Sequence, residues 1–139
     1  METDLQNAVA QLRNGDYTCV LCKDNTVYHS TQRGVRPLLN WLDNATDLMG
    51  FFAADKVVGR GAAFLYRLLG VRRVHGNIMS VAAVKVLRTG GIEATWDILA
   101  ESIRNRQGDG PCPMESATQD CTEPDEALAA IRSTLAKLS

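Results

Sequence analysis

The sequence predicts an α/β domain, a three-layer α-β-α sandwich whose mixed sheet combines an antiparallel hairpin with parallel strands. From residue 48 on, short apolar runs typical of strands alternate with segments of helical periodicity, which indicates parallel strands joined by right-handed crossovers. Before residue 30, two short strand-like runs flank a polar turn, which indicates a hairpin. The 139 residues, 45% of them apolar, suffice for one domain with a continuous core.

Local signals in the first half of the chain predict a helix, a hairpin and a second helix. Thr3 and Gln6 have the spacing of a capping box, and Asn14-Gly15 tolerates the backbone conformation that ends a helix. Pro37 suits the first turn of a helix, where its missing N–H would have no partner in any case. The predicted elements are, in order, a helix ending at residue 14, strands over 17–22 and 27–29 around the polar turn 23–26, and a helix from residue 37.

The second half of the chain predicts three strands, each followed by a helix. Residues 48–54 form a nearly continuous apolar run, typical of a strand buried on both faces. Ser80 is a natural N-cap, and Gly70 suits the end of a helix. The predicted elements are strands over 48–54, 71–79 and 92–96, helices between them, a helical stretch over 98–104 and a C-terminal helix. We interpret residues 1–139 as one domain, with 98–139 as its helical C-terminal extension.

Composition limits the classes of function. The formal net charge of −1 argues against nucleic-acid binding, which needs a basic surplus on at least one face. No apolar run approaches the roughly 20 residues of a membrane span, and no secretory signal is visible. Four cysteines without such a signal are expected to be thiols, so we expect a cytoplasmic location. A homo-oligomer is possible, because the sequence does not indicate the oligomeric state.

Four stretches of the chain carry a resemblance to a known family. They are residues 15–21 (GDYTCVL), 33–39 (RGVRPLL), 53–59 (AADKVVG) and 108–115 (GDGPCPME). Through them the chain resembles the uncharacterised family of the domain of unknown function DUF1893, within the cytidine-deaminase-like fold. The resemblance implies that fold and no established activity.

The zinc chemistry of deaminases can be tested against these residues. Such enzymes need His or Cys, then Glu two residues later, at the helix after the hairpin, and Pro-Cys-x-x-Cys at the next helix. Here the corresponding stretches are 33–37 (RGVRP) and 55–58 (DKVV), and neither contains His or Cys. We therefore predict no zinc-dependent deamination, no metal site and no other cofactor.

Charged residues near two predicted helix starts suggest an anion site. Asp55 and Lys56 are expected to follow a buried strand and open a helix, in the crevice where α/β sheets bind ligands. Lys56 beside free helix N–H groups would favour phosphate or carboxylate. Arg33 and Arg36 flank Gly34 at the preceding helix start, and the resemblance implies that both starts meet at one pocket. The alternatives are that Asp55 merely caps its helix and that the cations are solvated.

The segment Pro111-Cys112-Pro113-Met114-Glu115 suggests a reactive thiol. Two prolines stiffen the backbone around Cys112, and a helix beginning at Pro113 would place the thiol at a positive helix terminus that favours thiolate. Glu115 is a candidate for orienting a partner or moving a proton. We predict that Cys112 faces the pocket of Asp55 and Lys56 and is unusually reactive. The alternative is a rigid structural loop with a packed thiol.

Two other features favour structural interpretations. Cys19 and Cys22 have C-x-x-C spacing within a strand pattern, so their side chains point to opposite faces and do not easily share a metal. His75 lies within a predicted strand, where a hydrogen-bonded core or edge histidine is expected.

The leading hypothesis is a protein that binds a small anionic or nucleotide-like metabolite without zinc. In its enzymatic form, Lys56, Asp55 and Arg36 bind or polarise the ligand, and Cys112 with Glu115 is the reactive pair. The alternatives are a non-catalytic ligand-binding or regulatory module and a thiol redox sensor centred on Cys112.

Overall fold

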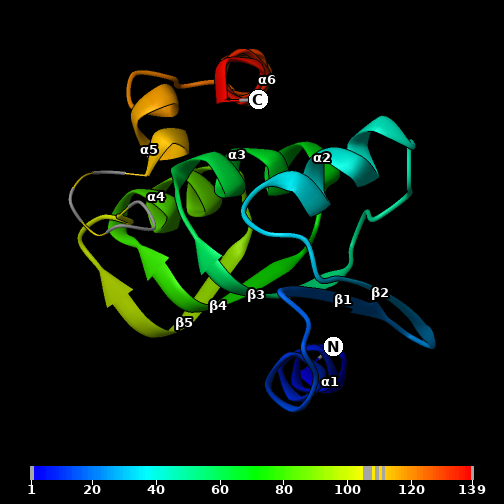
Figure 1. Cartoon of the computed structure of the whole chain (residues 1–139). Helices are drawn as coiled ribbons and strands as arrows, with labels where there is room; N and C mark the ends of the chain where they lie inside the picture. The colour runs from blue at the N-terminus through cyan, green and yellow to red at the C-terminus, as the bar shows by residue number, and fades with distance from the viewer. Residues whose placement is uncertain (1, 105–107, 109, 111, 139) are drawn as a thin grey trace.

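The centre of the molecule is a five-stranded mixed sheet in the order β2-β1-β3-β4-β5 (Figure 1). The computed structural model describes residues 2–104, 108, 110 and 112–138. β1 pairs antiparallel with both β2 and β3, whereas β3, β4 and β5 run parallel, as predicted. The strands are Cys19–Lys23 (β1), Thr26–Ser30 (β2), Phe52–Val58 (β3), Arg73–Ser80 (β4) and Glu93–Ala100 (β5).

Helices cover both faces of the sheet, which confirms the predicted three-layer α/β architecture. α1 packs on one face, against β1 and β3, while α2, α3 and α4 lie on the other (Figure 1). α5 and α6 lie beyond this helical layer and pack on α3. The helices are Glu2–Asn14 (α1), Arg36–Asp43 (α2), Arg60–Leu69 (α3), Val81–Thr89 (α4), Pro113–Thr118 (α5) and Pro124–Leu138 (α6).

The sheet separates two apolar clusters of unequal size. The larger cluster fills the space between the sheet and the layer of α2, α3 and α4. Tyr66 and Phe64 of α3 are among its largest side chains. The smaller one lies beneath α1. Cys19 belongs to the first cluster and Cys22 to the second, so the predicted opposite orientation is confirmed. All four cysteines are free thiols.

The prediction for β3 is wrong in its bounds. The strand begins at Phe52 and continues through Asp55 and Lys56 to Val58. Leu48 and Phe51 are buried in a loop, so their apolar character reflects packing and not strand structure. The polar pair Asp55-Lys56 does not mark the end of the strand, because Asp55 still lies opposite Cys19 in the β1–β3 ladder.

The prediction of a helical stretch over 98–104 is also wrong. β5 continues to Ala100, and Ile98 and Leu99 lie opposite Ile78 and Met79 of β4. Parallel pairing with β4 therefore overrides the helical spacing of these apolar residues. Within the described residues, the helices of the C-terminal extension are α5 and α6.

Several predicted turns and caps are confirmed. The Ser80 hydroxyl accepts a hydrogen bond from the Ala83 N–H at 3.0 Å and caps α4. Gly70 ends α3 in the left-handed conformation that favours glycine. The Thr3 side chain and residues 107, 109 and 111 of the predicted Cys112 loop lie outside the described part of the chain. In the described residues, no helix combines the length and apolar character of a bilayer span.

Candidate functional site

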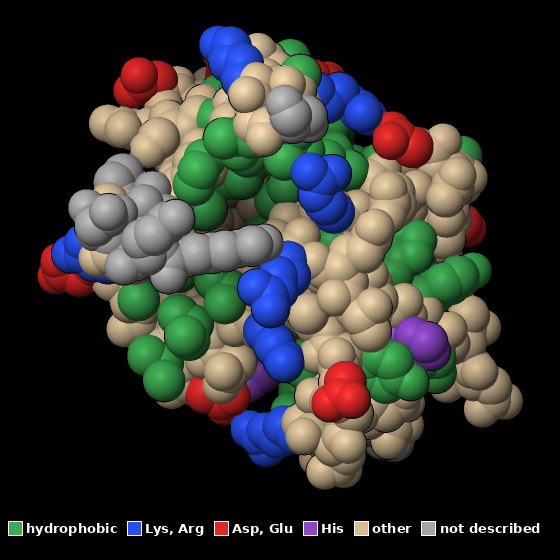
Figure 2. All heavy atoms as spheres, viewed as in Figure 1, with side chains coloured by type: hydrophobic (Ala, Val, Ile, Leu, Met, Phe, Trp, Pro, Cys, Tyr) green, Lys and Arg blue, Asp and Glu red, His purple; other side chains and the backbone are tan. Residues whose placement is uncertain are grey.

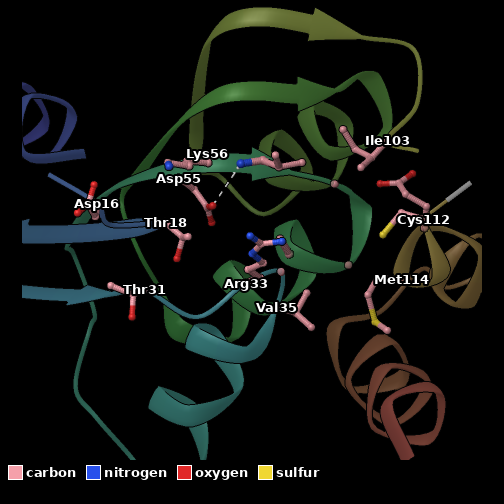
Figure 3. A pocket seen from close by; sticks show the side chains of 16 residues that line it. Asp16, Thr18, Thr31, Arg33, Val35, Asp55, Lys56, Ile103, Cys112 and Met114 are labelled. Atoms are coloured by element: carbon pink, nitrogen blue, oxygen red, sulfur yellow. Dashed lines mark hydrogen bonds between the residues drawn. The ribbon is translucent and has the colours of Figure 1, made fainter. Parts of the chain in front are cut away.

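A cavity of about 510 Å³ lies where the carboxyl end of β3 meets the first turns of α2, α3 and α5. This is the crevice position at which open α/β sheets bind ligands. The surface is hollowed there, with apolar and basic side chains at the border (Figure 2). Two sides of the cavity face each other in Figure 3. We call them the sheet side (Thr18, Asp55, Lys56, Val57) and the α5 side (Cys112, Met114, Glu115).

Six of the seven residues predicted to form the site line this cavity: Arg33, Gly34, Asp55, Lys56, Cys112 and Glu115. Arg36 is the seventh, and it is not among the described residues that line the cavity. It is the first residue of α2 and is exposed, while the preceding Val35 is buried against the core. Gly34, with a φ of +65°, supplies the turn that leads from Arg33 into this helix.

The charged pair Asp55-Lys56 reaches the cavity from a strand and not from a helix start. α3 begins at Arg60, with Gly59 as its N-cap residue. Asp55 therefore does not cap a helix, and Lys56 is not held beside the N–H groups of α3. Because neighbouring residues of a strand point to opposite faces, Asp55 points to the face covered by α2, α3 and α4, where Tyr66 reaches it, and Lys56 points to the face of α1.

The first turn of α3 is capped by Glu115 from α5. A Glu115 carboxylate oxygen accepts a hydrogen bond from the Arg60 N–H and lies 3.5 Å from the Ser80 hydroxyl. A side chain at Gly59 would come too close to that carboxylate, so the Glu115 side chain would have to move away from the start of α3. In return, the Arg60 guanidinium donates to the carbonyl oxygens of Thr118 at 2.7 Å and Cys121 at 2.6 Å. These bonds hold α5 beside the cavity.

Asp55 stands at one end of a buried hydrogen-bonded chain. Its carboxylate Oδ2 accepts a hydrogen bond from the Tyr66 hydroxyl at 2.7 Å. The Tyr66 hydroxyl oxygen lies 3.2 Å from the Cys19 Sγ. Asp55 is 6% exposed, Tyr66 0% and Cys19 1%, so three ionisable side chains from β3, α3 and β1 meet inside the core.

Burial sets the protonation of these three groups. It raises the pKa of Asp55 from its ordinary 3.8 to about 7, although hydrogen bonds from Tyr66 and from the Val57 N–H oppose the rise. Burial also raises the pKa values of Tyr66 and Cys19 well above their ordinary range, and the nearby Asp55 charge adds to both increases. Asp55 is therefore the member of the chain that gains and loses a proton near neutral pH.

Cys112 lies on the α5 side and is partly exposed. Its N–H donates to the Ile103 carbonyl at 2.9 Å, and its carbonyl accepts from the Ser116 N–H at 3.1 Å. Pro113 begins α5, so the condition for placing Cys112 at a helix start is met, but this helix has only six residues. The structure brings Cys112 to the same cavity as Asp55 and Lys56, while its reactivity stays a prediction.

Lys56 also borders a smaller cavity of about 200 Å³ that adjoins α1. His75 lies there, with its Nδ1 2.8 Å from the Thr95 hydroxyl and its Nε2 3.2 Å from the Asp97 carboxylate. The predicted hydrogen-bonded histidine is thus confirmed, and its partners are neighbours on β5.

Tyr66 and Cys19 are the site residues that sequence reasoning missed. Tyr66 belongs to the inward face of α3, where it resembles any large core residue. Cys19 drew notice only for its spacing to Cys22. A sharper signal was Asp55 itself, because a carboxyl within an apolar run of residues needs a buried hydrogen-bond donor.

Within the described residues, no group of three or more His, Cys, Asp or Glu side chains could hold a metal ion. The starts of α2 and α3, at Val35-Arg36 and Gly59-Arg60, contain neither His nor Cys. The second helix start thus lies a few residues beyond the stretch 55–58 in which the sequence analysis placed it. The absence of zinc stays a prediction, which elemental analysis of the purified protein would test.

Fold and cavity together define an α/β domain with a crevice at the carboxyl end of its parallel strands. The chain belongs to the DUF1893 family, described as a domain of unknown function, because the family model matches residues 7–135. The crystal structure of a DUF1893 family protein (TM1506) from Thermotoga maritima is similar, with a TM-score of 0.88 and 20% identity. The match covers 96% of this chain and 90% of that one.

A second structure is less similar. It is a diaminohydroxyphosphoribosylaminopyrimidine deaminase/5-amino-6-(5-phosphoribosylamino)uracil reductase from Thermotoga maritima, with a TM-score of 0.45 and 15% identity. The match covers 70% of this chain and 36% of that one. A similarity at this level assigns neither a reaction nor a substrate to the present chain. No curated protein matches the sequence.

Proposed function

We propose that this protein binds a small anionic metabolite, up to the size of a nucleotide, in the cavity between the sheet and α5. The observation that carries the proposal is one cavity of about 510 Å³ bordered by Arg33 and Lys56. That volume lies within the range of small-molecule sites, which is about 300 to 1,000 Å³. Arg33 comes from the loop before α2 and Lys56 from β3, so the two cations approach from separate elements.

The other residues that line the cavity indicate which further chemical groups such a ligand would carry. Val35, Val57, Ile103 and Met114 supply apolar surface for its body. The cavity is also bordered by carboxyl groups, of which Asp16 is exposed and Glu115 is engaged by the Arg60 N–H. The Asp55 carboxylate on the sheet side can accept a hydrogen bond, so it suits a donor group on the ligand. The ligand best matched to this lining therefore carries both a negative charge and a donor group.

A second candidate function is covalent or redox chemistry at Cys112. The observation that favours it is the partly exposed thiol on the wall of the same cavity. Glu115 is a weak proton carrier for this thiol, because its carboxylate caps α3. If the thiol does not react, the protein binds the proposed ligand without catalysing a reaction.

Binding of defined probes tests the proposal. Inorganic phosphate, a nucleoside and the corresponding nucleoside monophosphate are titrated into the protein by calorimetry. We expect the monophosphate to bind most tightly, and Arg33→Ala or Lys56→Ala to weaken it about 10- to 100-fold, the range for a hydrogen bond to a charged group. Arg36→Ala is the matched control, since Arg36 is exposed outside the cavity. Equal losses in Arg33→Ala and Arg36→Ala, or no binding of any probe, would overturn the proposal.

A further inference from the structure

The buried hydrogen-bonded chain Cys19–Tyr66–Asp55 is an arrangement that costs folding free energy in a protein core. Burying polar groups costs free energy unless each finds a partner, and a buried carboxyl costs most when it ionises. An apolar side chain at position 55 would fill the same space without that cost. All three side chains are nonetheless almost fully buried in one place, and Asp55 alone of them borders the cavity.

The hydrogens of this chain have a defined direction. The Tyr66 O–H donates to Asp55 Oδ2 at 2.7 Å, so its own oxygen is left to accept the Cys19 S–H at 3.2 Å. Both Tyr66 and Cys19 stay neutral at neutral pH, because burial raises the pKa values of both. While Asp55 is a carboxylate, the chain therefore presents the Tyr66 O–H group to Oδ2.

The second carboxylate oxygen has weaker protein contacts. Asp55 Oδ1 lies 3.4 Å from the Val57 N–H, a long hydrogen bond. The Asp55 carboxyl points into the cavity in Figure 3, toward the side from which Arg33 enters. One oxygen is thus held by Tyr66 in the core, while the other makes a long bond to the Val57 N–H, and the Lys56 N–H adds a further hydrogen bond to this carboxylate.

We propose that Tyr66, supported by Cys19, positions the Asp55 carboxyl as the group that exchanges a proton with the ligand in this cavity. The inference rests on the proposed function for the ligand and on the buried chain for the geometry. In the forward step the O–H bond at Asp55 Oδ1 breaks, and the proton forms a new bond to a basic nitrogen or oxygen of the ligand. The carboxylate that remains accepts hydrogen bonds from the Tyr66 O–H and the Val57 N–H, and the reverse step restores the acid.

Other charged side chains also line the cavity that Asp55 borders. Lys56 and Arg33 favour the carboxylate, whereas Asp16 and Glu115 favour the protonated acid. Cys112 borders the cavity from α5. An anionic ligand that neutralises the two cations would favour the protonated acid, so ligand binding and protonation of Asp55 are coupled.

The experiment follows the Asp55 carboxyl carbon by NMR against pH in ligand-free protein labelled at aspartate, with Asp55→Asn to assign the signal. We expect a midpoint near neutral pH in the native protein. Tyr66→Phe keeps the ring and removes the hydrogen bond that favours the carboxylate. It should lower the Asp55 ionisation constant about tenfold, since such a bond contributes about 1.4 kcal/mol. Tyr28→Phe is the matched control, because Tyr28 packs on Trp41 and Phe51.

A midpoint near the ordinary aspartate value, or a midpoint that Tyr66→Phe does not move, would overturn the inference. A change of equal size in Tyr28→Phe would also overturn it. If the midpoint moves as expected but no phosphate or nucleoside monophosphate binds, the proposed ligand fails and the positioning of Asp55 by Tyr66 stands.

Discussion

The two sides of the cavity differ in how their polar groups are used. On the sheet side, Asp55 accepts a hydrogen bond from Tyr66 within the core, and its other oxygen makes only a long bond to the Val57 N–H. On the α5 side, the Glu115 carboxylate is engaged with the backbone of α3, and the Arg60 guanidinium holds the end of α5 in return. The α5 side is thus built mainly to hold a segment in place, and the sheet side to hold a carboxyl in an unusual state.

This difference shows that the segment with the most distinctive sequence pattern need not contain the residue whose pKa is most perturbed. The stretch around Cys112, with its prolines and glycines, is the more distinctive one. Asp55, however, has its pKa raised to about 7 by burial, which is the range that acid–base chemistry needs.

The largest expected difference concerns access to the thiols. Iodoacetamide should modify Cys112 on the order of 1,000-fold faster than Cys19, because Cys19 lies in a core strand that reacts only when the fold opens. Peptide mass spectrometry over a time course measures both rates, and in urea the two should converge. The rate of Cys112 relative to a free thiol also tests its predicted reactivity. Similar native rates for both would mean that the buried chain around Asp55 is open to solvent.

The next largest effect is on stability. The raised pKa of Asp55 means that the folded protein binds an extra proton between about pH 4 and pH 7, so native stability falls as pH rises through this window. Asp55→Asn removes the ionisation and keeps an acceptor for Tyr66. We expect it to be more stable than the native protein by up to about 4 kcal/mol at pH 8, with little difference at pH 4.

Urea unfolding at the two pH values measures this effect, with the exposed Asp120→Asn as the control. A loss of stability in Asp55→Asn at pH 8 would contradict it.

The α5 side should respond to steric change. Gly59→Ala places a methyl group against the Glu115 carboxylate and Ile103, and should cost about 1 to 3 kcal/mol of unfolding free energy. Because Glu115 makes the closest contact, the same substitution should cost less in a Glu115→Ala background. Urea unfolding of the four variants gives the coupling energy. Additive costs would show that Glu115 does not hold α5 against α3 as described.

The smallest effect tests the far end of the buried chain. Cys19→Ala removes the S–H donor to Tyr66, which should weaken the bond from Tyr66 to Asp55 and lower the Asp55 ionisation constant about twofold or less. Cys22→Ala, on the opposite face of β1, is the matched control. The NMR titration of Asp55 separates the two variants, and a larger change in Cys22→Ala would refute the assigned direction of the chain.

Much of this architecture is predictable from local signals. The Ser80 cap, the hairpin and the parallel strands each have a short sequence pattern, and the rule for α/β crevices places the cavity correctly. Tyr66 and Cys19 have no such pattern, because they meet only through the packing of α3 on the sheet, 47 residues apart in the chain. The sequence pattern predicts a helix start at Asp55, because a polar pair follows an apolar run, although the strand continues to Val58.

Proton exchange on ligand binding tests the central claim most directly. Calorimetry of a nucleoside monophosphate at pH 7, in two buffers of different ionisation enthalpy, gives the number of protons exchanged per ligand bound. With a pKa of about 7, about half of the Asp55 carboxyls carry a proton in the free protein. Binding that selects one form should therefore exchange up to about half a proton more in the native protein than in Asp55→Asn. Tight binding with equal proton exchange in both proteins would contradict the assignment of Asp55 as the proton-exchanging group.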